Sequence, residues 1–127
     1  MIVVVDASAV IDALLGVAGL IERLRVLDLH APVSIDAEFL HGTRRKLLGR
    51  LIDTNDAETL IETFRVLPII RHPVQRLVPR MWALRDNITA YDAGYVALAE
   101  SLDVPLLTRD RRLSRSSGHA ARIEYID

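Results

Sequence analysis

Hydrophobic and polar residues follow one another along this chain in blocks that predict strands and helices in turn. Short apolar stretches predict strands over residues 2–6, 31–35, 66–70, 105–107 and 122–126. Stretches with apolar residues three or four positions apart predict helices over residues 8–16, 18–29, 37–51, 53–64, 72–84, 89–102 and 111–114. Because strands alternate with helices, the order predicts an α/β fold with a mostly parallel central sheet and right-handed crossovers.

Several local features refine these elements. Asp36 is a plausible N-cap for the helix over residues 37–51, and Asp53 or Thr54 caps the next helix. The spacing in residues 37–51 predicts an inward face made of leucines, namely Leu40, Leu47, Leu48 and Leu51. Trp82 is the only tryptophan, and we interpret it as a core residue or a partner contact.

Composition limits the class of protein. The chain has 127 residues, of which 50% are hydrophobic and 5% aromatic, so a single domain over residues 1–127 with an aliphatic core is expected. The absence of cysteine excludes disulfides and zinc–thiolate sites. We find neither a signal peptide nor an apolar run long enough for a membrane span, and therefore expect a cytoplasmic protein without membrane contact.

Four acidic residues stand at strand ends or in first helical turns: Asp6, Glu38, Asp92 and Asp110. If the strands are parallel, residues at their carboxyl ends meet at one edge of the sheet, where α/β folds bind ligands. Carboxylates that lie close together repel unless a cation sits among them, and Mg²⁺ or Mn²⁺ suits a site built from oxygen ligands. The pattern therefore predicts a metal-dependent phosphodiester hydrolase.

Each acid also has an ordinary structural interpretation. Asp6 and Asp110 are suitable helix caps, whereas Asp92 and Glu38 suit the positive end of a helix dipole. By residue type alone, Asp36 and Glu38 compete evenly for the same functional position. Asp12, which follows no strand, is interpreted as a solvated helix residue.

Arginines cluster in two places although the net charge is only −1. One cluster lies on the helix over residues 37–51, and the other surrounds Asp110. Arginine binds phosphate in a bidentate manner, but such clusters are also typical of solvated helix faces. Thr108 and Asp110 project to the same side of an extended segment, so both side chains are expected at the same cleft. Tyr91 and Tyr95 are suited to stacking on a base, but core packing is the preferred interpretation.

Four segments in order resemble the PIN-domain ribonucleases, and the length resembles the VapC toxins of bacterial VapBC toxin–antitoxin pairs. The segments are Asp6-Ala7-Ser8, Asp36-Ala37-Glu38-Phe39-Leu40, Thr89-Ala90-Tyr91-Asp92-Ala93-Gly94-Tyr95-Val96-Ala97-Leu98-Ala99 and Leu107-Thr108-Arg109-Asp110-Arg111-Arg112-Leu113. The resemblance implies a three-layer α/β/α domain. It assigns the acidic quartet to Asp6, Glu38, Asp92 and Asp110, and the supporting polar positions to Ser8 and Thr108.

The resemblance also implies an activity and partners. The quartet would bind Mg²⁺ or Mn²⁺ and hydrolyse RNA to 5′-phosphate and 3′-hydroxyl ends. A cognate VapB-type antitoxin would inhibit the enzyme, and a homodimer is expected. The groove between residues 37–51 and 53–64 is the expected docking site for an antitoxin helix. The arginines expected to hold the RNA backbone are Arg109, Arg111, Arg112, Arg44 and Arg45.

Three other functions fit parts of the pattern. A phospho-receiver module also has acids at strand ends, but it needs a lysine at a late strand end, and the only lysine, Lys46, falls within a predicted helix. A catalytically inactive PIN-like domain would bind partners only. A nuclease for structured DNA would carry insertions that this short chain lacks.

Overall fold

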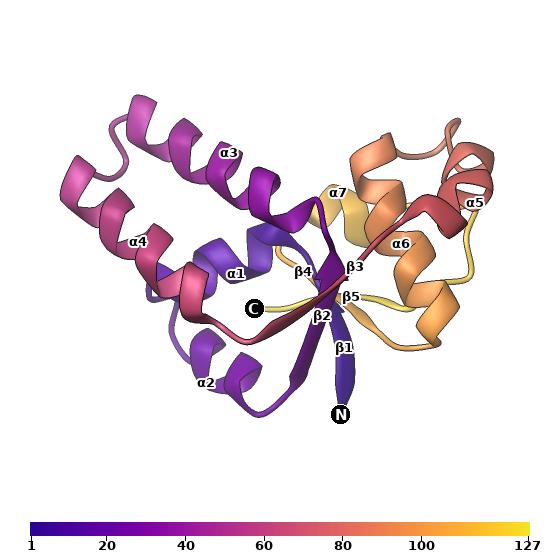
Figure 1. Cartoon of the computed structure of the whole chain (residues 1–127), viewed down its shortest axis with the longest axis horizontal. Helices are drawn as coiled ribbons and strands as arrows, with labels where there is room; N and C mark the ends of the chain where they lie inside the picture. The colour runs from indigo at the N-terminus through magenta and orange to yellow at the C-terminus, as the bar shows by residue number, and fades with distance from the viewer.

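The protein is built around a five-stranded parallel sheet with the strand order β3-β2-β1-β4-β5. The computed structural model describes residues 1–127. The strands are β1 (Ile2–Val5), β2 (Asp28–Pro32), β3 (Ile69–His72), β4 (Leu106–Thr108) and β5 (Ile123–Tyr125). The helices are α1 (Ala7–Leu14), α2 (Leu20–Arg25), α3 (Ile35–Leu48), α4 (Thr54–Val66), η1 (Gln75–Leu77), α5 (Val78–Ala83), α6 (Ala90–Leu102) and α7 (Arg111–Ser114). This arrangement confirms the predicted α/β fold (Figure 1).

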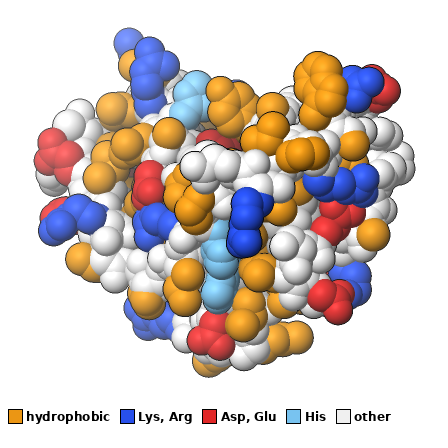
Figure 2. Space-filling view, turned by 45° about the vertical axis from the view of Figure 1, so that its right-hand side comes forward, with side chains coloured by type: hydrophobic (Ala, Val, Ile, Leu, Met, Phe, Trp, Pro, Cys, Tyr) orange, Lys and Arg blue, Asp and Glu red, His pale blue; other side chains and the backbone are white.

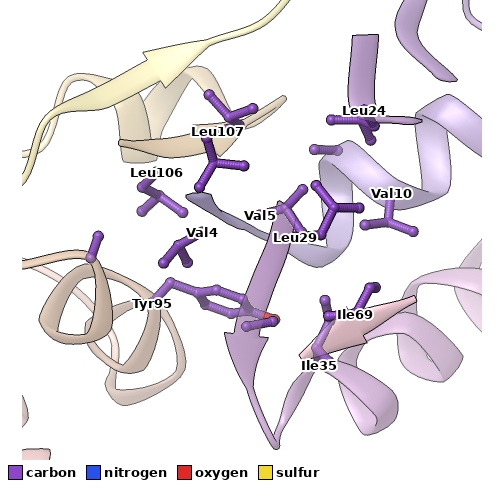
Figure 3. Packing of buried hydrophobic residues seen from close by; sticks show 14 of the residues in the cluster. Val4, Val5, Val10, Leu24, Leu29, Ile35, Ile69, Tyr95, Leu106 and Leu107 are labelled. Carbon is purple, nitrogen blue, oxygen red and sulfur yellow. The ribbon is translucent and has the colours of Figure 1, made fainter. Parts of the chain in front are cut away.

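Helices cover both faces of the sheet. Seen edge-on in Figure 1, the strands separate α5 and α6 on one side from α1, α2 and the α3–α4 hairpin on the other. Successive side chains of a strand point to opposite faces, so β1 contributes to both layers. Figure 3 shows Val4 beside Tyr95 of α6, whereas Val5 lies toward Val10 of α1. The central strand is therefore buried on both sides, as its continuous apolar sequence predicts.

The second strand begins earlier than its sequence pattern indicates. The predicted helix over residues 18–29 is wrong at its end, since α2 stops at Arg25 and Asp28 already pairs with Ile2. The strand predicted over residues 31–35 is displaced for the same reason, because β2 ends at Pro32 and Ile35 starts α3. Leu27 continues the helical stripe of Leu20 and Leu24 up to the strand, so pairing with β1 and β3 decides where the helix ends and β2 begins.

The inward face of α3 is also different from the prediction. Leu40, Leu48 and Leu51 are exposed by 49%, 63% and 74%, whereas Phe39 is fully buried. Phe39 stacks on Phe64 of α4 with ring centroids 3.8 Å apart and an interplanar angle of 8°. The buried residues of α3 are Ile35, Phe39 and Thr43, which are four positions apart, so this stripe rather than the leucines faces the core.

Helix boundaries elsewhere follow local chemistry. Asp53 caps α4 in a reciprocal capping box with Asp56, as one of the two predicted caps. The strand expected over residues 66–70 is shifted to β3, and the helix expected over 72–84 is divided into η1 and α5. Trp82 is 67% exposed, so its interpretation as a core residue is wrong. None of the helices has the length and apolar character required to cross a membrane.

Candidate active site

Asp6 lies at the carboxyl end of the central strand, where β1 passes into α1. Its backbone N–H still bonds to the carbonyl of Leu107 on β4, which fixes the residue between two strands. Its Oδ1 accepts from Ser8 Oγ at 2.7 Å and from the N–H of Ala9 at 3.0 Å, so Asp6 is also the N-cap of α1. The carboxyl is buried, and desolvation raises its pKa to about 6 despite these hydrogen bonds.

Two hydroxyl groups support Asp6, and they belong to the predicted polar positions. Thr108 is fully buried at the end of β4 and donates from Oγ1 to Oδ2 of Asp6. Ser8 Oγ accepts from the backbone N–H of Arg109 at 3.0 Å, which ties the start of α1 to the segment after β4. The two sequence-distant segments therefore meet at one carboxylate.

Glu38 lies in the first turn of α3 and reaches toward the same edge of the sheet. Its Oε2 accepts from Ser34 Oγ at 2.8 Å and from the phenol of Tyr95 at 2.9 Å. Burial raises the pKa of Glu38, and the negative charge of Asp92 adds to this effect, while the two hydrogen bonds oppose it. Oε1 carries no hydrogen bond from the protein and remains available for a ligand or a water molecule.

Asp92 and Asp110 complete the group from the far side of β4. Asp92 lies in the first turn of α6, and its pKa is raised by burial and by the charge of Asp110. Asp110 caps α7, because its Oδ1 accepts from the N–H groups of Arg112 and Leu113 at 2.9 and 3.3 Å. Its own N–H donates to Thr108 Oγ1 at 2.9 Å, so the extended segment holds the two side chains at one place.

The structure thus brings the four predicted acids into one electrostatically linked group. The charge of Asp110 acts on Asp6 and Asp92, that of Asp92 acts on Glu38, and the Tyr95 hydroxyl is influenced by Glu38, Asp6 and Asp92. They do not form a ready-made cage, since no three His, Cys, Asp or Glu side chains are arranged to hold a metal ion.

Other acids considered from the sequence have different partners. Asp36 does not cap α3, because the helix already begins at Ile35. Its carboxylate is held instead by Arg71 of β3, through Nε at 2.8 Å and Nη2 at 2.8 Å. This ion pair leaves Glu38 as the acid of α3 that faces the site. Asp12 is not a freely solvated residue, because it pairs with Arg109 Nε at 3.0 Å.

The arginines proposed for RNA binding differ in what their guanidinium groups contact. Arg109 is occupied by Asp12 and by the carbonyl of Ile126, and Arg111 lies over the ring of Tyr125 at 4.1 Å. Arg112 is close to the acids, with its guanidinium 3.7 Å from Oδ2 of Asp110. Arg44 and Arg45 are exposed on α3, away from the carboxylates.

Sequence reasoning overlooked Ser34 and Tyr95 as parts of this site. Tyr95 is 1% exposed, which fits the predicted core role, but its hydroxyl is aimed at Glu38 rather than at water. The spacing from Asp92 to Tyr95 is one helical turn, so the two residues share a face of α6, which is the signal available in the sequence. A phenol that must leave water needs a buried partner, and Glu38 is that partner.

Comparisons with known proteins bear on the family of the chain. The family model for the PIN domain matches residues 3–118. Ribonuclease VapC12 of Mycobacterium tuberculosis is 38% identical over 127 residues, covering 98% of each chain. Ribonuclease VapC1 of the same species is 42% identical over 128 residues, covering 97% of this chain and 96% of its own.

Solved structures share the fold at lower identity. VapBC2 from Rickettsia felis, bound to a DNA fragment from its promoter, gives a TM-score of 0.71 at 12% identity, with 98% of both chains covered. VapC20 of Mycobacterium tuberculosis, a toxin that cleaves the sarcin–ricin loop, gives 0.59 at 18% identity, covering 88% of this chain and 92% of its own. At these identities the likeness concerns the fold alone.

Proposed function

This chain belongs to the PIN-domain family, and we propose that it is an endoribonuclease toxin that hydrolyses RNA phosphodiester bonds under the control of a cognate antitoxin. Membership confirms the resemblance drawn from the sequence and removes the phospho-receiver alternative. The observation that carries the activity is the group of four linked carboxylates at the carboxyl edge of the sheet. No cation of the protein neutralises Asp6 at its centre.

The donor set fits a hard divalent cation in chemistry, although the carboxylates are not yet closed around one. Asp6, Glu38, Asp92 and Asp110 supply only oxygen atoms, and Mg²⁺ keeps several waters that bridge to ligands at a distance. Oε1 of Glu38 and Oδ2 of Asp110 accept no hydrogen bond within the protein. A bound Mg²⁺ or Mn²⁺ supplies charge neutralisation at the phosphate and a more acidic water molecule.

The residues of the chain then have separable tasks. Asp6 is fixed by Ser8 and Thr108, so it contributes a carboxylate that does not rotate. Glu38, with its raised pKa and free Oε1, is suited to take a proton from the attacking water. Arg112, beside Asp110, is placed to contact a phosphate oxygen of the substrate.

Metal removal tests this function directly. The purified protein should cleave single-stranded RNA in Mg²⁺ or Mn²⁺ and lose that activity in EDTA, with recovery after the cation is restored. Gel analysis of a labelled RNA measures the cut, and end-group analysis should find 5′-phosphates. Cleavage that continues in EDTA at an undiminished rate, by protein free of contaminating nuclease, would rule out the proposed chemistry.

Substituting Tyr95 by Phe tests how Glu38 is positioned. Removal of the phenol leaves Ser34 as the only donor to Oε2, so kcat should fall about tenfold with little change in KM. The hydrogen bond from Tyr95 stabilises the ionised carboxylate, so the pKa of Glu38 should rise further without it. The acid limb of the pH–rate profile should therefore move to higher pH.

Tyr91→Phe is the matched control, because Tyr91 lies on the same helix but is 69% exposed. It should leave both kcat and the pH profile unchanged. Thermal unfolding of each variant separates positioning from a loss of fold. An unshifted pH profile in a folded Tyr95→Phe protein would contradict the role assigned to this hydroxyl.

The surface of the α3–α4 hairpin supports the antitoxin partner. Leu40, Leu48 and Leu51 are exposed along α3 and its end, so an apolar strip faces solvent where the sequence pattern predicts inward leucines. An amphipathic helix of an antitoxin would bury this strip in the helix-in-groove manner. Co-expression with the cognate antitoxin tests this docking surface. Replacing Leu48 by Arg should abolish copurification of the antitoxin but preserve RNA cleavage.

A further inference from the structure

A polar hollow of about 740 Å³ opens beside Asp92, on the side of the acids away from α3. Its walls come from the turn before α6, with Arg85 and Thr89, and from α7 and the turn after it, with Arg112 and Arg115. Most of its lining is polar or charged. The volume is within the range of pockets for small organic ligands, so an ordinary nucleotide fits.

The lining carries more positive than negative charge. Arg85, Arg112 and Arg115 face Asp86 and Asp92, and no carboxylate lies within ion-pair distance of Arg85 or Arg115. The chain as a whole has a net charge of −1, and Figure 2 shows basic side chains dispersed among acidic and hydrophobic ones. The hollow therefore combines two arginines without an ion-pair partner with a position beside Asp92 of the acidic group.

Arg85 is held in place without being neutralised. Its Nη1 donates to the carbonyl of Trp82 at 3.1 Å, and its guanidinium lies 4.7 Å from the centre of the Trp82 ring. Both contacts restrict the side chain, but neither supplies a negative charge. A guanidinium in this state retains its capacity to bind a phosphate and loses little conformational entropy in doing so.

Arg112 connects the hollow to the acids. It lies 3.7 Å from Oδ2 of Asp110, and its side chain is 80% exposed. An exposed ion pair at this distance is weak, so the guanidinium is free to turn to a substrate phosphate. An RNA phosphate bound to Arg112 would be adjacent to Asp92 and Asp110. The neighbouring phosphates of the same RNA strand would reach Arg85 and Arg115.

We propose that this hollow binds the sugar–phosphate backbone of single-stranded RNA next to the bond that is cut, with Arg85 and Arg115 as phosphate ligands. The inference rests on the proposed ribonuclease function and adds a substrate subsite to it. Asn87 and Thr89 on one wall and Ser117 on the other supply donors and acceptors for ribose hydroxyls. Arg109 and Arg111, which the sequence singled out, are engaged elsewhere.

Salt-dependent binding tests the subsite without any need for turnover. Asp6→Asn serves as a non-cleaving background, and fluorescence anisotropy measures its affinity for a labelled single-stranded RNA between about 50 and 200 mM KCl. Adding Arg85→Gln and Arg115→Gln should weaken binding roughly tenfold. The slope of log affinity against log salt should fall in magnitude by about 1.4, because each phosphate of a single strand that the protein no longer neutralises accounts for about 0.7.

Matched variants keep the result interpretable. Arg25→Gln removes an arginine that is also exposed, from α2 and outside the hollow, and should leave both affinity and slope unchanged. If Arg85→Gln impairs folding, Arg115→Gln alone serves as the test. It removes no contact within the protein and should give half of the slope change. Equal losses of affinity from Arg25→Gln and Arg115→Gln would show a general charge effect and overturn the subsite.

Failure of the subsite and failure of the function look different. A wild-type protein that cleaves RNA while the double variant binds and cleaves equally well would overturn the subsite and leave the function intact. Absence of cleavage by wild-type protein would instead reject the function, and the anisotropy slopes would still decide whether these arginines bind an RNA backbone.

Discussion

Replacing Asp6 by Asn is expected to lower RNA cleavage at least about 100-fold and, at the same time, to make the protein more stable at neutral pH. Activity falls because the buried carboxylate at the centre of the site loses its charge. The side chain keeps its shape, and the Asn oxygen can still accept from Ser8 and from the N–H of Ala9. The Thr108 hydroxyl, which donates to the second carboxylate oxygen of Asp6, turns to accept from the Asn NH2. The fold should therefore survive the change.

The gain in stability follows from the raised pKa of Asp6, which is about 6 in the folded protein against 3.8 for the unperturbed group. Below about pH 4 the Asp6 carboxyl is protonated in both the folded and the unfolded protein, and its full contribution to the free energy of unfolding is present. As the pH rises toward 6, the unfolded chain releases its proton first, so the free energy of unfolding decreases. Above about pH 6 this decrease in the free energy of unfolding is complete, and it amounts to at most roughly 3 kcal/mol.

Urea denaturation in EDTA at pH 4 and pH 7 measures this difference. Asp6→Asn should match the wild type near pH 4 and exceed it by about 1–3 kcal/mol at pH 7. Asp28→Asn is the control, because Asp28 is exposed at the opposite end of the sheet. This substitution should change neither the pH dependence of the free energy of unfolding nor the activity. Marked destabilisation of Asp6→Asn at pH 7 would instead give this carboxylate a structural role.

Replacing Phe39 by Ala should cost about 3–5 kcal/mol of unfolding free energy, a large part of the stability of a domain of this size. The ring is fully buried and stacked on Phe64, so its removal leaves a cavity between α3 and α4. Glu38 directly precedes it on the same helix. Loosening of the hairpin should therefore reduce RNA cleavage as well as stability.

Leu40→Ala provides the matched comparison one residue further along α3. Leu40 is 49% exposed, so the cost should stay below about 1 kcal/mol with activity preserved. Denaturant midpoints of the two variants, at equal transition slopes, measure the difference. A larger loss of unfolding free energy in Leu40→Ala than in Phe39→Ala would support the inward leucine face predicted from the sequence.

The order of elements was predictable because burial on both faces leaves a strong signal in a parallel strand. Ile2–Val5 is apolar throughout, and Leu106–Thr108 follows a helix of small residues, so both strands were found to within a residue or two. The limits of β2 were not predictable, because Leu27 continues the helical period of Leu20 and Leu24 beyond the end of α2. Only pairing with β1 and β3, which is a tertiary effect, decides between the two conformations.

The candidate site was predictable in position and less so in detail. Strand ends and first helical turns located Asp6, Glu38, Asp92 and Asp110, and the structure places all four at one edge. The choice between Asp36 and Glu38 depends on Arg71, which is distant in sequence and comes from a strand whose limits were shifted. Arg85 was missed, and Arg115 was noted only as a member of the arginine cluster around Asp110, since their shared hollow exists only after α6 and α7 have packed together.

The bond from Thr108 to Asp6 spans 102 positions of the chain, and this has a consequence for timing during translation. The ribosome produces Asp6 near the beginning, yet the strand that lies beside it, β4, comes late. Until β4 has emerged, β1 has one unpaired edge, and the acid lacks its threonine donor and its neighbour Asp110. A polypeptide that still lacks β4 therefore has an incomplete acidic group, because Asp110 and the threonine donor to Asp6 arrive together with that strand.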